Sequence, residues 1–311
     1  MSTVLVTGGA GFIGSHLVRR LLAEGLQVRV LDDFSTGHER NLAEVADRIE
    51  LIRGSICDAE TANRAAEGVE AVFHLAARAS VPRSVEQPRE SNEVNVTGTL
   101  NMLLAARDGG ARRFIYSASS SAYGDTPTLP KVESMTPCPQ SPYAVSKLAG
   151  EHYCSCFARV YGLETISLRY FNVFGPRQDP DSPYAAVIPA FVSRMVRNQR
   201  PVVFGDGEQT RDFCYIDNVV QANYLAFSAP RLSGEVVNIA CGERTSLNRI
   251  IALINRALGK HIEPIYDQPR PGDVRDSLAD ISAARRVLGY EPLVLFAEGL
   301  ERSIAWYREN T

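Results

Sequence analysis

Several polar residues in the middle of the chain have the types and spacing needed for proton transfer. The stretch SASSSAYG, residues 117–124, places four serines and a tyrosine in eight positions. Tyr143 and Lys147 follow, and on a helix residues four apart share one face. A lysine cation beside a tyrosine hydroxyl favours tyrosinate, which tyrosine needs to act as a base near neutrality because its ordinary pKa is about 10. Tyrosine and lysine at this spacing also occur on many solvated helices, so the pair has to be judged with its surroundings.

The serine-rich stretch has three possible interpretations: a polar linker, the seat of a serine nucleophile, or part of a proton relay. The apolar run ARRFIY comes before it and predicts a strand, while SPYAVSKLAGEHY after it predicts a helix. The serines therefore lie where a buried strand turns toward a helix, a frequent place for catalytic groups. No G-x-S-x-G elbow or paired histidine surrounds them, so a nucleophile is disfavoured.

A glycine-rich stretch near the N-terminus, TGGAGFIG, predicts a dinucleotide-binding turn. Gly9, Gly11 and Gly14 satisfy G-x-G-x-x-G, and Gly8 provides an alternative first glycine. A strand is predicted before this turn and a helix after it, so that the helix N-terminus would face a pyrophosphate. Asp32 ends the next predicted strand, where a carboxylate accepts hydrogen bonds from the adenosine ribose and repels a 2′-phosphate. The pattern favours NAD over NADP, although a turn or capping aspartate is the alternative.

The elements that position these residues alternate between strand and helix. Strands are predicted over 3–9, 27–33, 48–54, 70–76, 112–118 and 164–172, and helices over 12–25, 58–68, 91–110 and 141–162, with Asp58 as a candidate cap. Alternation of this kind predicts an α/β fold with a doubly wound parallel sheet, a Rossmann fold. Beyond Asn172 the elements shorten, so we expect an NAD-binding domain at 1–171 and a smaller α/β substrate lobe at 172–311, some of whose segments return to the first domain.

The composition excludes several classes of protein. The 311 residues carry a net charge of −3, so no general attraction to nucleic acid or to a membrane surface is expected. Six cysteines form no C-x-x-C pair and five histidines have no metal-ligand spacing, so we expect no metal. The chain shows no signal peptide and no apolar run long enough to span a bilayer, which leads us to expect a cytoplasmic protein.

Taken together, the glycine turn, the serine-ended strand and the Y-x-x-x-K helix resemble the extended short-chain dehydrogenase/reductase superfamily. Further stretches sharpen the resemblance to its sugar-nucleotide epimerases, most closely the bacterial UDP-N-acetylglucosamine 4-epimerases: HLAARASVPRSV, NVTGTLN, LRYFNVFGPRQ, GDGEQTRDFCYID and RPGDVRDSLADISAARRVLGY. The resemblance runs essentially from end to end. It implies an isomerase with NAD as cofactor, a UDP-sugar as substrate, and a homodimer formed through the helices near 92–108 and 143–160.

The resemblance also implies roles for individual residues. Ser119, Tyr143 and Lys147 would be catalytic, and Ser117 and Ser121 would line or support the site. Phe204 would lie near the uracil, and Arg211 and Arg270 near the phosphates. The implied cofactor-binding residues are Gly8, Gly11, Phe12, Ile13, Gly14, Asp32, Phe34, Ser35, Thr36, Gly37, Ser55, Ile56, Leu75, Ala76, Ala77, Arg78, Asn95, Ser117, Tyr143, Lys147 and Phe171. The implied substrate-binding residues are Ser80, Ser119, Ser121, Tyr143, Asn172, Val187, Val202, Phe204, Arg211, Arg270, Asp273 and Ser277.

Related branches of the superfamily differ at identifiable positions. Sugar-nucleotide 4,6-dehydratases carry an Asp-Glu pair, and UDP-glucuronate decarboxylases a glutamate, where this chain has Ser120 and Ser121. Elimination and decarboxylation are therefore disfavoured, which leaves reversible oxidation through a 4-keto sugar. One departure from many relatives is Ser55, in place of the aspartate that contacts adenine. A serine at this position can still form a hydrogen bond.

Ser277 bears on the choice of sugar. In the epimerases that this chain resembles, the residue four places after the Arg-Pro-Gly-Asp aspartate lines the hexose pocket, and its bulk limits the substituent at C2. The small Ser277 implies that UDP-N-acetylglucosamine and UDP-N-acetylgalactosamine are interconverted, together with UDP-glucose and UDP-galactose. The alternatives are an epimerase restricted to non-acetylated sugars, a net NAD-dependent dehydrogenase or reductase, and a non-catalytic nucleotide sensor.

Overall fold

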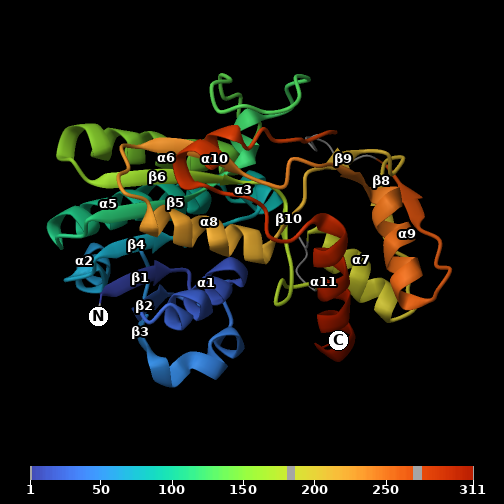
Figure 1. Cartoon of the computed structure of the whole chain (residues 1–311), viewed down its shortest axis with the longest axis horizontal. Helices are drawn as coiled ribbons and strands as arrows, with labels where there is room; N and C mark the ends of the chain where they lie inside the picture. The colour runs from blue at the N-terminus through green and yellow to red at the C-terminus, as the bar shows by residue number, and fades with distance from the viewer. Residues whose placement is uncertain (1, 181–185, 269–274, 311) are drawn as a thin grey trace.

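A single parallel sheet of seven strands forms the centre of the molecule (Figure 1). The computed structural model describes residues 2–180, 186–268 and 275–310. The strand order is β11-β6-β5-β4-β1-β2-β3, so the chain runs outward from β1 to one edge and then crosses over to fill the other. The strands are β1 (Thr3–Thr7), β2 (Gln27–Asp32), β3 (Ile49–Arg53), β4 (Ala71–His74), β5 (Arg113–Ser119), β6 (Glu164–Tyr170) and β11 (Glu235–Ile239). The predicted doubly wound sheet is confirmed.

Helices cover both faces of this sheet, because both faces of its strands are apolar. On β1, Val4 and Val6 point into one core and Leu5 into the other, as the alternation of a strand requires. The first face packs against α1 (Phe12–Ala23) and α8 (Ile216–Ser228). The second packs against α2 (Ala59–Ala66), α5 (Gly98–Asp108) and α6 (Pro142–Tyr161).

The helix α6, which carries the Tyr143 and Lys147 pair, has clear start and stop signals. The Ser141 hydroxyl accepts a hydrogen bond from the Ala144 N–H, and Pro142 stands in the first turn. The helix ends at Gly162, whose φ of 72° is left-handed. At α2, Asp58 accepts a hydrogen bond from the Thr61 N–H, which confirms the predicted cap.

The helix predicted over 91–110 contains an irregularity. It consists of α4 (Pro88–Asn92), a π-helical turn (Glu93–Thr97) and α5. Before it lies the short α3 (Val81–Glu86). The π turn contains Asn95, and π turns inside helices frequently accompany functional sites. Nothing in the apolar periodicity predicted this turn.

The second half of the chain forms smaller units beside the sheet. Its strands pair as β7 (Val173–Phe174) with β10 (Cys214–Tyr215), β8 (Val202–Phe204) with β13 (Ile265–Asp267), and β9 (Thr210–Arg211) with β12 (Thr245–Ser246). The helices α7 (Val187–Val196), α9 (Leu247–Leu258) and α11 (Phe296–Asn310) pack together away from the sheet, at the right of Figure 1. The strand β11 pairs with β6 and the helix α8 packs on β5 and β6, while α10 (Ser282–Leu288) packs against β11 and α8. None of the described helices has the length and apolar character needed to cross a membrane.

Candidate functional site

The glycine turn after β1 is packed so tightly that side chains would not fit. Gly8 has a φ of +69°, and a Cβ on it would lie 2.8 Å from the backbone nitrogen of Ala76. A Cβ on Gly14 would lie 2.1 Å from the carbonyl oxygen of Gly8. The turn thus brings bare backbone to the start of α1, which is the arrangement that a dinucleotide pyrophosphate needs.

Asp32 lies at the carboxyl end of β2, beside this turn. The side chain is buried, and its carboxylate accepts hydrogen bonds from the backbone N–H groups of Ala10 and Phe34, both at 2.8 Å. Burial raises the pKa of the carboxyl, and the two N–H groups oppose this. Two hydrogen bonds leave acceptor capacity for ribose hydroxyls, so Asp32 fits the role predicted for it.

Most of the other predicted cofactor residues follow the carboxyl ends of neighbouring strands. Phe34, Ser35, Thr36 and Gly37 follow β2, Ser55 and Ile56 follow β3, Leu75, Ala76, Ala77 and Arg78 follow β4, and Phe171 follows β6, while Ser117 lies within β5. Because parallel strands end at one edge of the sheet, these residues gather beside the glycine turn. Asn95 is already engaged with protein: its side chain accepts from the Arg78 N–H at 2.7 Å and donates to the Ser146 hydroxyl at 3.0 Å.

The catalytic residues predicted from the sequence lie on two elements in contact, Ser119 on β5 and Tyr143 and Lys147 on α6. Ser119 is its last residue, and the Ser121 hydroxyl donates to the Ser119 hydroxyl at 2.8 Å. Burial raises the pKa of Tyr143, and the nearby Ser119 side chain opposes this increase. The backbone of Tyr143 is held as well, because its N–H donates to the buried Ser84 hydroxyl at 3.0 Å. Ser80 caps the helix that carries Ser84.

Lys147 is buried one helical turn beyond Tyr143. Burial lowers the pKa of its ammonium to about 8, and the nearby Glu151 opposes this decrease. Glu151 lies one turn further and forms a two-bond ion pair with Arg169 on β6, with N–O distances of 2.9 and 2.7 Å. Sequence reasoning missed this pair, although Glu151 continues the four-residue spacing that marked Tyr143 and Lys147.

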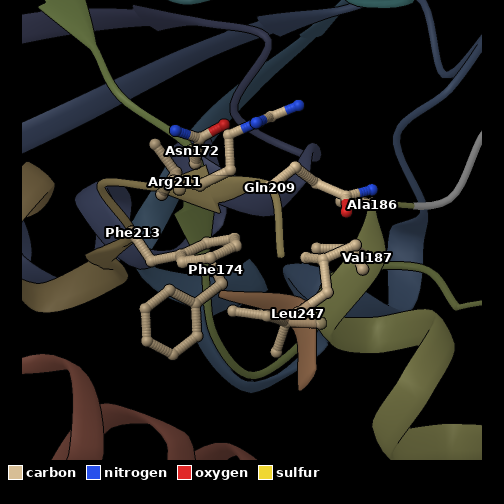
Figure 2. A pocket seen from close by; sticks show the side chains of 10 residues that line it. Asn172, Phe174, Ala186, Val187, Gln209, Arg211, Phe213 and Leu247 are labelled. Carbon is tan, nitrogen blue, oxygen red and sulfur yellow. The ribbon is translucent and has the colours of Figure 1, made fainter. Parts of the chain in front are cut away.

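A cavity of about 260 Å³ opens on the side of the second half of the chain (Figure 2). Its apolar side chains, among them Phe174, Phe213 and Leu247, gather at one end in Figure 2, and the polar ends of Arg211 and Gln209 lie at the other. The lining residues are Asn172, Val173, Phe174, Ala186, Val187, Ile188, Gln209, Arg211, Phe213 and Leu247.

Only some of the predicted substrate-binding residues line this cavity. Asn172, Val187 and Arg211 line it, whereas Val202 and Phe204 on β8 do not. Arg270 and Asp273 lie outside the described residues. Gln209 was missed: its amide nitrogen donates to the carbonyl of Phe204 at 2.6 Å, and its buried amide oxygen has no partner among the described residues.

Ser277 is not a lining residue of this cavity, but it contacts Asn172, which is. The Asn172 amide nitrogen donates to the Ser277 hydroxyl at 3.2 Å and to the backbone carbonyl of Asp212 at 2.8 Å. The Asp212 carboxylate is buried and accepts hydrogen bonds from the backbone N–H groups of Cys241, Gly242 and Ala279. Asp212 was also missed, because its partners are distant in sequence and lie in irregular segments.

The described residues contain no candidate metal site and no disulfide. No group of three or more histidine, cysteine, aspartate or glutamate side chains there could hold a metal ion. All six cysteines are free thiols.

Comparisons with known proteins show the family to which this chain is related. Residues 4–240 match the NAD dependent epimerase/dehydratase family. A UDP-glucose 4-epimerase of Mycolicibacterium smegmatis is 41% identical over 311 residues, covering 99% of both chains. The crystal structure of a Thermotoga maritima UDP-glucose 4-epimerase with UDP-glucose superposes with a TM-score of 0.94 at 41% identity, covering 99% of both chains. A UDP-N-acetylglucosamine 4-epimerase from Methanobrevibacter ruminantium, in complex with UDP-N-acetylmuramic acid, superposes with a TM-score of 0.95 at 39% identity, covering 100% of this chain and 99% of that one.

Proposed function

The chain belongs to the NAD-dependent epimerase/dehydratase family and is a UDP-sugar 4-epimerase, and we propose that it interconverts UDP-N-acetylglucosamine and UDP-N-acetylgalactosamine as well as UDP-glucose and UDP-galactose. The observation that carries the choice of sugar is the small Ser277, whose hydroxyl contacts Asn172 at the wall of the cavity. Both epimers must fit for a full cycle, so the residue at this position limits what C2 can carry.

The residues beside the glycine turn fit NAD. Gly8 and Gly14 allow the close approach of a pyrophosphate, and the Asp32 carboxylate would accept hydrogen bonds from the adenosine ribose. Bound NAD supplies a site that takes a hydride from C4 of the sugar and returns it. Asp32 would also repel a 2′-phosphate, which supports a preference for NAD over NADP.

Proton transfer falls to the residues at the end of β5 and on α6. Tyr143, as tyrosinate, removes the proton of the sugar 4-hydroxyl, and the nearby Ser119 hydroxyl bridges the two oxygens. The Lys147 ammonium stabilises the tyrosinate. When hydride returns to the opposite face, Tyr143 gives the proton back to the inverted oxygen. The buried main-chain bond from Tyr143 to Ser84 keeps the base in place.

The neighbourhood of Ser119 supports epimerisation over the reactions of related enzymes. Ser120 and Ser121 stand where a dehydratase or decarboxylase would carry carboxylates, and neither can protonate a leaving hydroxyl. A 4-keto sugar held here would therefore be reduced again without losing a group.

We also propose the two-lobe division and a homodimer. Residues 1–171 would bind the cofactor and 172–311 the nucleotide sugar, with β11 and α8 returning to the sheet. On α6, Val145 and Val160 are 53% and 65% exposed, so a dimer contact through this helix would bury apolar side chains.

The purified protein should be incubated separately with UDP-N-acetylglucosamine and UDP-glucose, and the products resolved by proton NMR. We expect the 4-epimer of each to form without accumulation of NADH. Accumulating NADH would indicate a net dehydrogenase, and binding without conversion would indicate a sensor.

The proposal that residue 277 limits the C2 substituent, and so acts as a substrate gate, is tested with Ser277→Tyr. Ser277→Ala is a matched control that keeps the pocket open. The tyrosine should abolish conversion of the N-acetylated pair and spare the non-acetylated pair, while the alanine should convert both. Conversion of UDP-glucose alone by the wild type, or unchanged turnover of UDP-N-acetylglucosamine by Ser277→Tyr, would show that this position is not the gate.

A further inference from the structure

A second tyrosine lies beneath the catalytic lysine. The Lys147 Nζ is 4.7 Å from the centroid of the Tyr116 ring, and the Tyr116 hydroxyl donates to the carbonyl oxygen of Lys147 at 3.3 Å. The Tyr116 side chain, on β5, is completely buried. A cation over the face of an aromatic ring is attracted by the ring quadrupole, and the attraction is strongest where water is excluded.

A buried histidine, His74, stacks on the Tyr116 ring. The His74 ring, on β4, stacks on the Tyr116 ring with centroids 5.9 Å apart and planes 18° apart, and it also contacts Phe114 at 5.4 Å. Burial lowers the pKa of His74 to about 3, and the charge of Lys147 contributes to this decrease. His74 is therefore a neutral ring next to the cation.

The hydrogen bonds of His74 fix its tautomer. The Thr99 hydroxyl donates to the carbonyl of Asn95 at 2.7 Å, so it accepts from His74 Nε2–H at 3.0 Å. The Thr7 hydroxyl accepts from the Ala76 N–H at 3.2 Å and donates to His74 Nδ1 at 2.9 Å. Every polar atom of this buried network has a partner, which locks the orientation of the His74 ring.

The helix α6 makes room for the Tyr116 side chain at Gly150, which has no side chain. Gly150 lies on α6 one turn beyond Lys147, and a Cβ added to it would lie 2.2 Å from the Tyr116 hydroxyl. The absence of a side chain at Gly150 lets the hydroxyl end of the Tyr116 ring approach the helix that carries Lys147. Helix propensity disfavours glycine in a helix interior, so packing against Tyr116 accounts for it.

We propose that Tyr116 and His74 form an aromatic platform that holds the Lys147 ammonium in place, so that both are positioning residues for proton transfer by Tyr143. This inference rests on the proposed function, in which Lys147 stabilises the tyrosinate. The two tyrosines near the ammonium have different roles. Burial raises the pKa of Tyr116 well above its ordinary value, and its hydroxyl bonds to the backbone of α6, so Tyr116 is not the base.

Several titratable or charged groups face Lys147. Glu151 and Cys154 face it from α6, Tyr116 from β5 and His74 from β4, and Tyr143 lies one turn before it on α6. Arg169 on β6 is paired with Glu151. Glu151 alone carries a negative charge to offset the ammonium, and it shares that charge with Arg169. The aromatic platform therefore stabilises the Lys147 ammonium beyond what the Glu151 carboxylate provides.

The chain has three lysines, at 131, 147 and 260, so a protein labelled with ¹³Cε-lysine gives a spectrum that can be assigned by substitution. The Lys147 resonance should be displaced upfield by the Tyr116 ring current. Lys260, whose Nζ donates to the carbonyl oxygens of Met195 and Val196 at 2.9 Å, serves as an internal reference. This measurement needs no turnover, so it decides the platform even if the proposed reaction is wrong.

Two variants then separate the ring from its hydroxyl. Tyr116→Met fills the space without a π face, so the upfield displacement should disappear and the pKa of Lys147 should fall. Because the ammonium then stabilises the tyrosinate less, Tyr143 should lose its proton at higher pH, and the acid limb of log(kcat/KM) should move upward by about one pH unit. Tyr116→Phe keeps the ring and should retain the displacement with a much smaller change of profile. Tyr224→Leu, which removes the ring beneath Arg20 at 5.0 Å from its centroid, is the matched control and should move neither readout.

The platform would be disproved by a wild-type Lys147 resonance with no displacement, or by a Tyr116→Met variant that titrates and turns over as the wild type does. If Tyr116→Met does not fold, the wild-type displacement and the Tyr116→Phe profile still decide. A wild type that shows the displacement but no epimerase activity would support the platform and refute the proposed function.

Discussion

Two buried charge clusters, one in each half of the molecule, are held in different ways. In the first, Lys147, Glu151 and Arg169 come from a helix and a strand and face one another through their side chains. In the second, a single buried carboxylate, Asp212, accepts three backbone N–H groups at 3.0 to 3.1 Å. The first arrangement places charges where they act on a proton. The second uses a charge to fix the course of the backbone around a cavity.

This difference implies that substitutions in the two halves have separate effects. Those in the first cluster should change the rate, its pH dependence, or the stability of the sheet. Those around Asp212 should change nucleotide binding, because Asp212 ties together the segments that hold Ser277 and Asn172. A substitution that produced the opposite effect would contradict the comparison.

Replacing Tyr143 by Phe should have the largest effect. Loss of a general base reduces turnover by about 10²–10⁴-fold, while the contact of the Tyr143 backbone with Ser84 remains and keeps the fold. Turnover and NAD affinity should be measured on the same preparation, and only turnover should fall. Tyr161→Phe, at the exposed end of the same helix, is the control. Turnover near that of the wild type in Tyr143→Phe would remove Tyr143 from the mechanism.

Replacing Glu151 by Ala should have the next largest effect, on stability. Arg169 would be left buried and unpaired, which costs about 3–5 kcal/mol of unfolding free energy. Denaturant unfolding measures this loss. The double variant Glu151→Met with Arg169→Met should be close to the wild type in stability, because apolar side chains of similar volume replace the pair.

An exposed ion pair provides the matched comparison for this variant. Arg285 and Glu291 pair at 2.8 Å on the surface, and Glu291→Ala should cost less than about 1 kcal/mol. Equal losses in Glu151→Ala and Glu291→Ala would mean that burial of the first pair has no energetic consequence.

The same contrast explains what the sequence could predict. Tyr143 and Lys147 were found because helical periodicity places them on one face, and the sheet was found because buried parallel strands are short apolar runs. The spacing extends to Glu151, but its partner Arg169 lies on another element and becomes visible only in the fold. Tyr116 was read only as the end of a strand, since the sequence does not show that Gly150 makes room for its ring.

The cavity was predicted less completely, because it is assembled from distant and irregular segments. Asn172, Val187 and Arg211 followed from the family resemblance, while Gln209, Phe213 and Leu247 have no local pattern that marks them. Val202 and Phe204, expected at the substrate, lie on β8 and are not lining residues, although the Phe204 carbonyl accepts a hydrogen bond from the lining residue Gln209. Residues that meet only after the chain has folded leave no periodic signal.

The smallest predicted effect concerns the centre of that assembly, Asp212. Asp212→Asn keeps one acceptor oxygen and turns the other into a donor, so some of the three N–H bonds are lost and the cavity wall loosens. We expect UDP affinity, measured by calorimetry, to fall about tenfold, roughly the free energy of one such bond, with NAD affinity unchanged. Asp206→Asn, at an exposed aspartate paired with Arg275, is the control and should leave UDP affinity within about twofold.

Burial raises the pKa of Asp212 to about 6, against the effect of the three N–H groups. The carboxylate therefore takes up a proton as the pH falls through about 6, and the wild type then loses the same acceptors that the variant lacks. The difference in UDP affinity between wild type and Asp212→Asn should shrink below that pH, and a difference that persisted to pH 5 would show that the charge of Asp212 does not organise the wall.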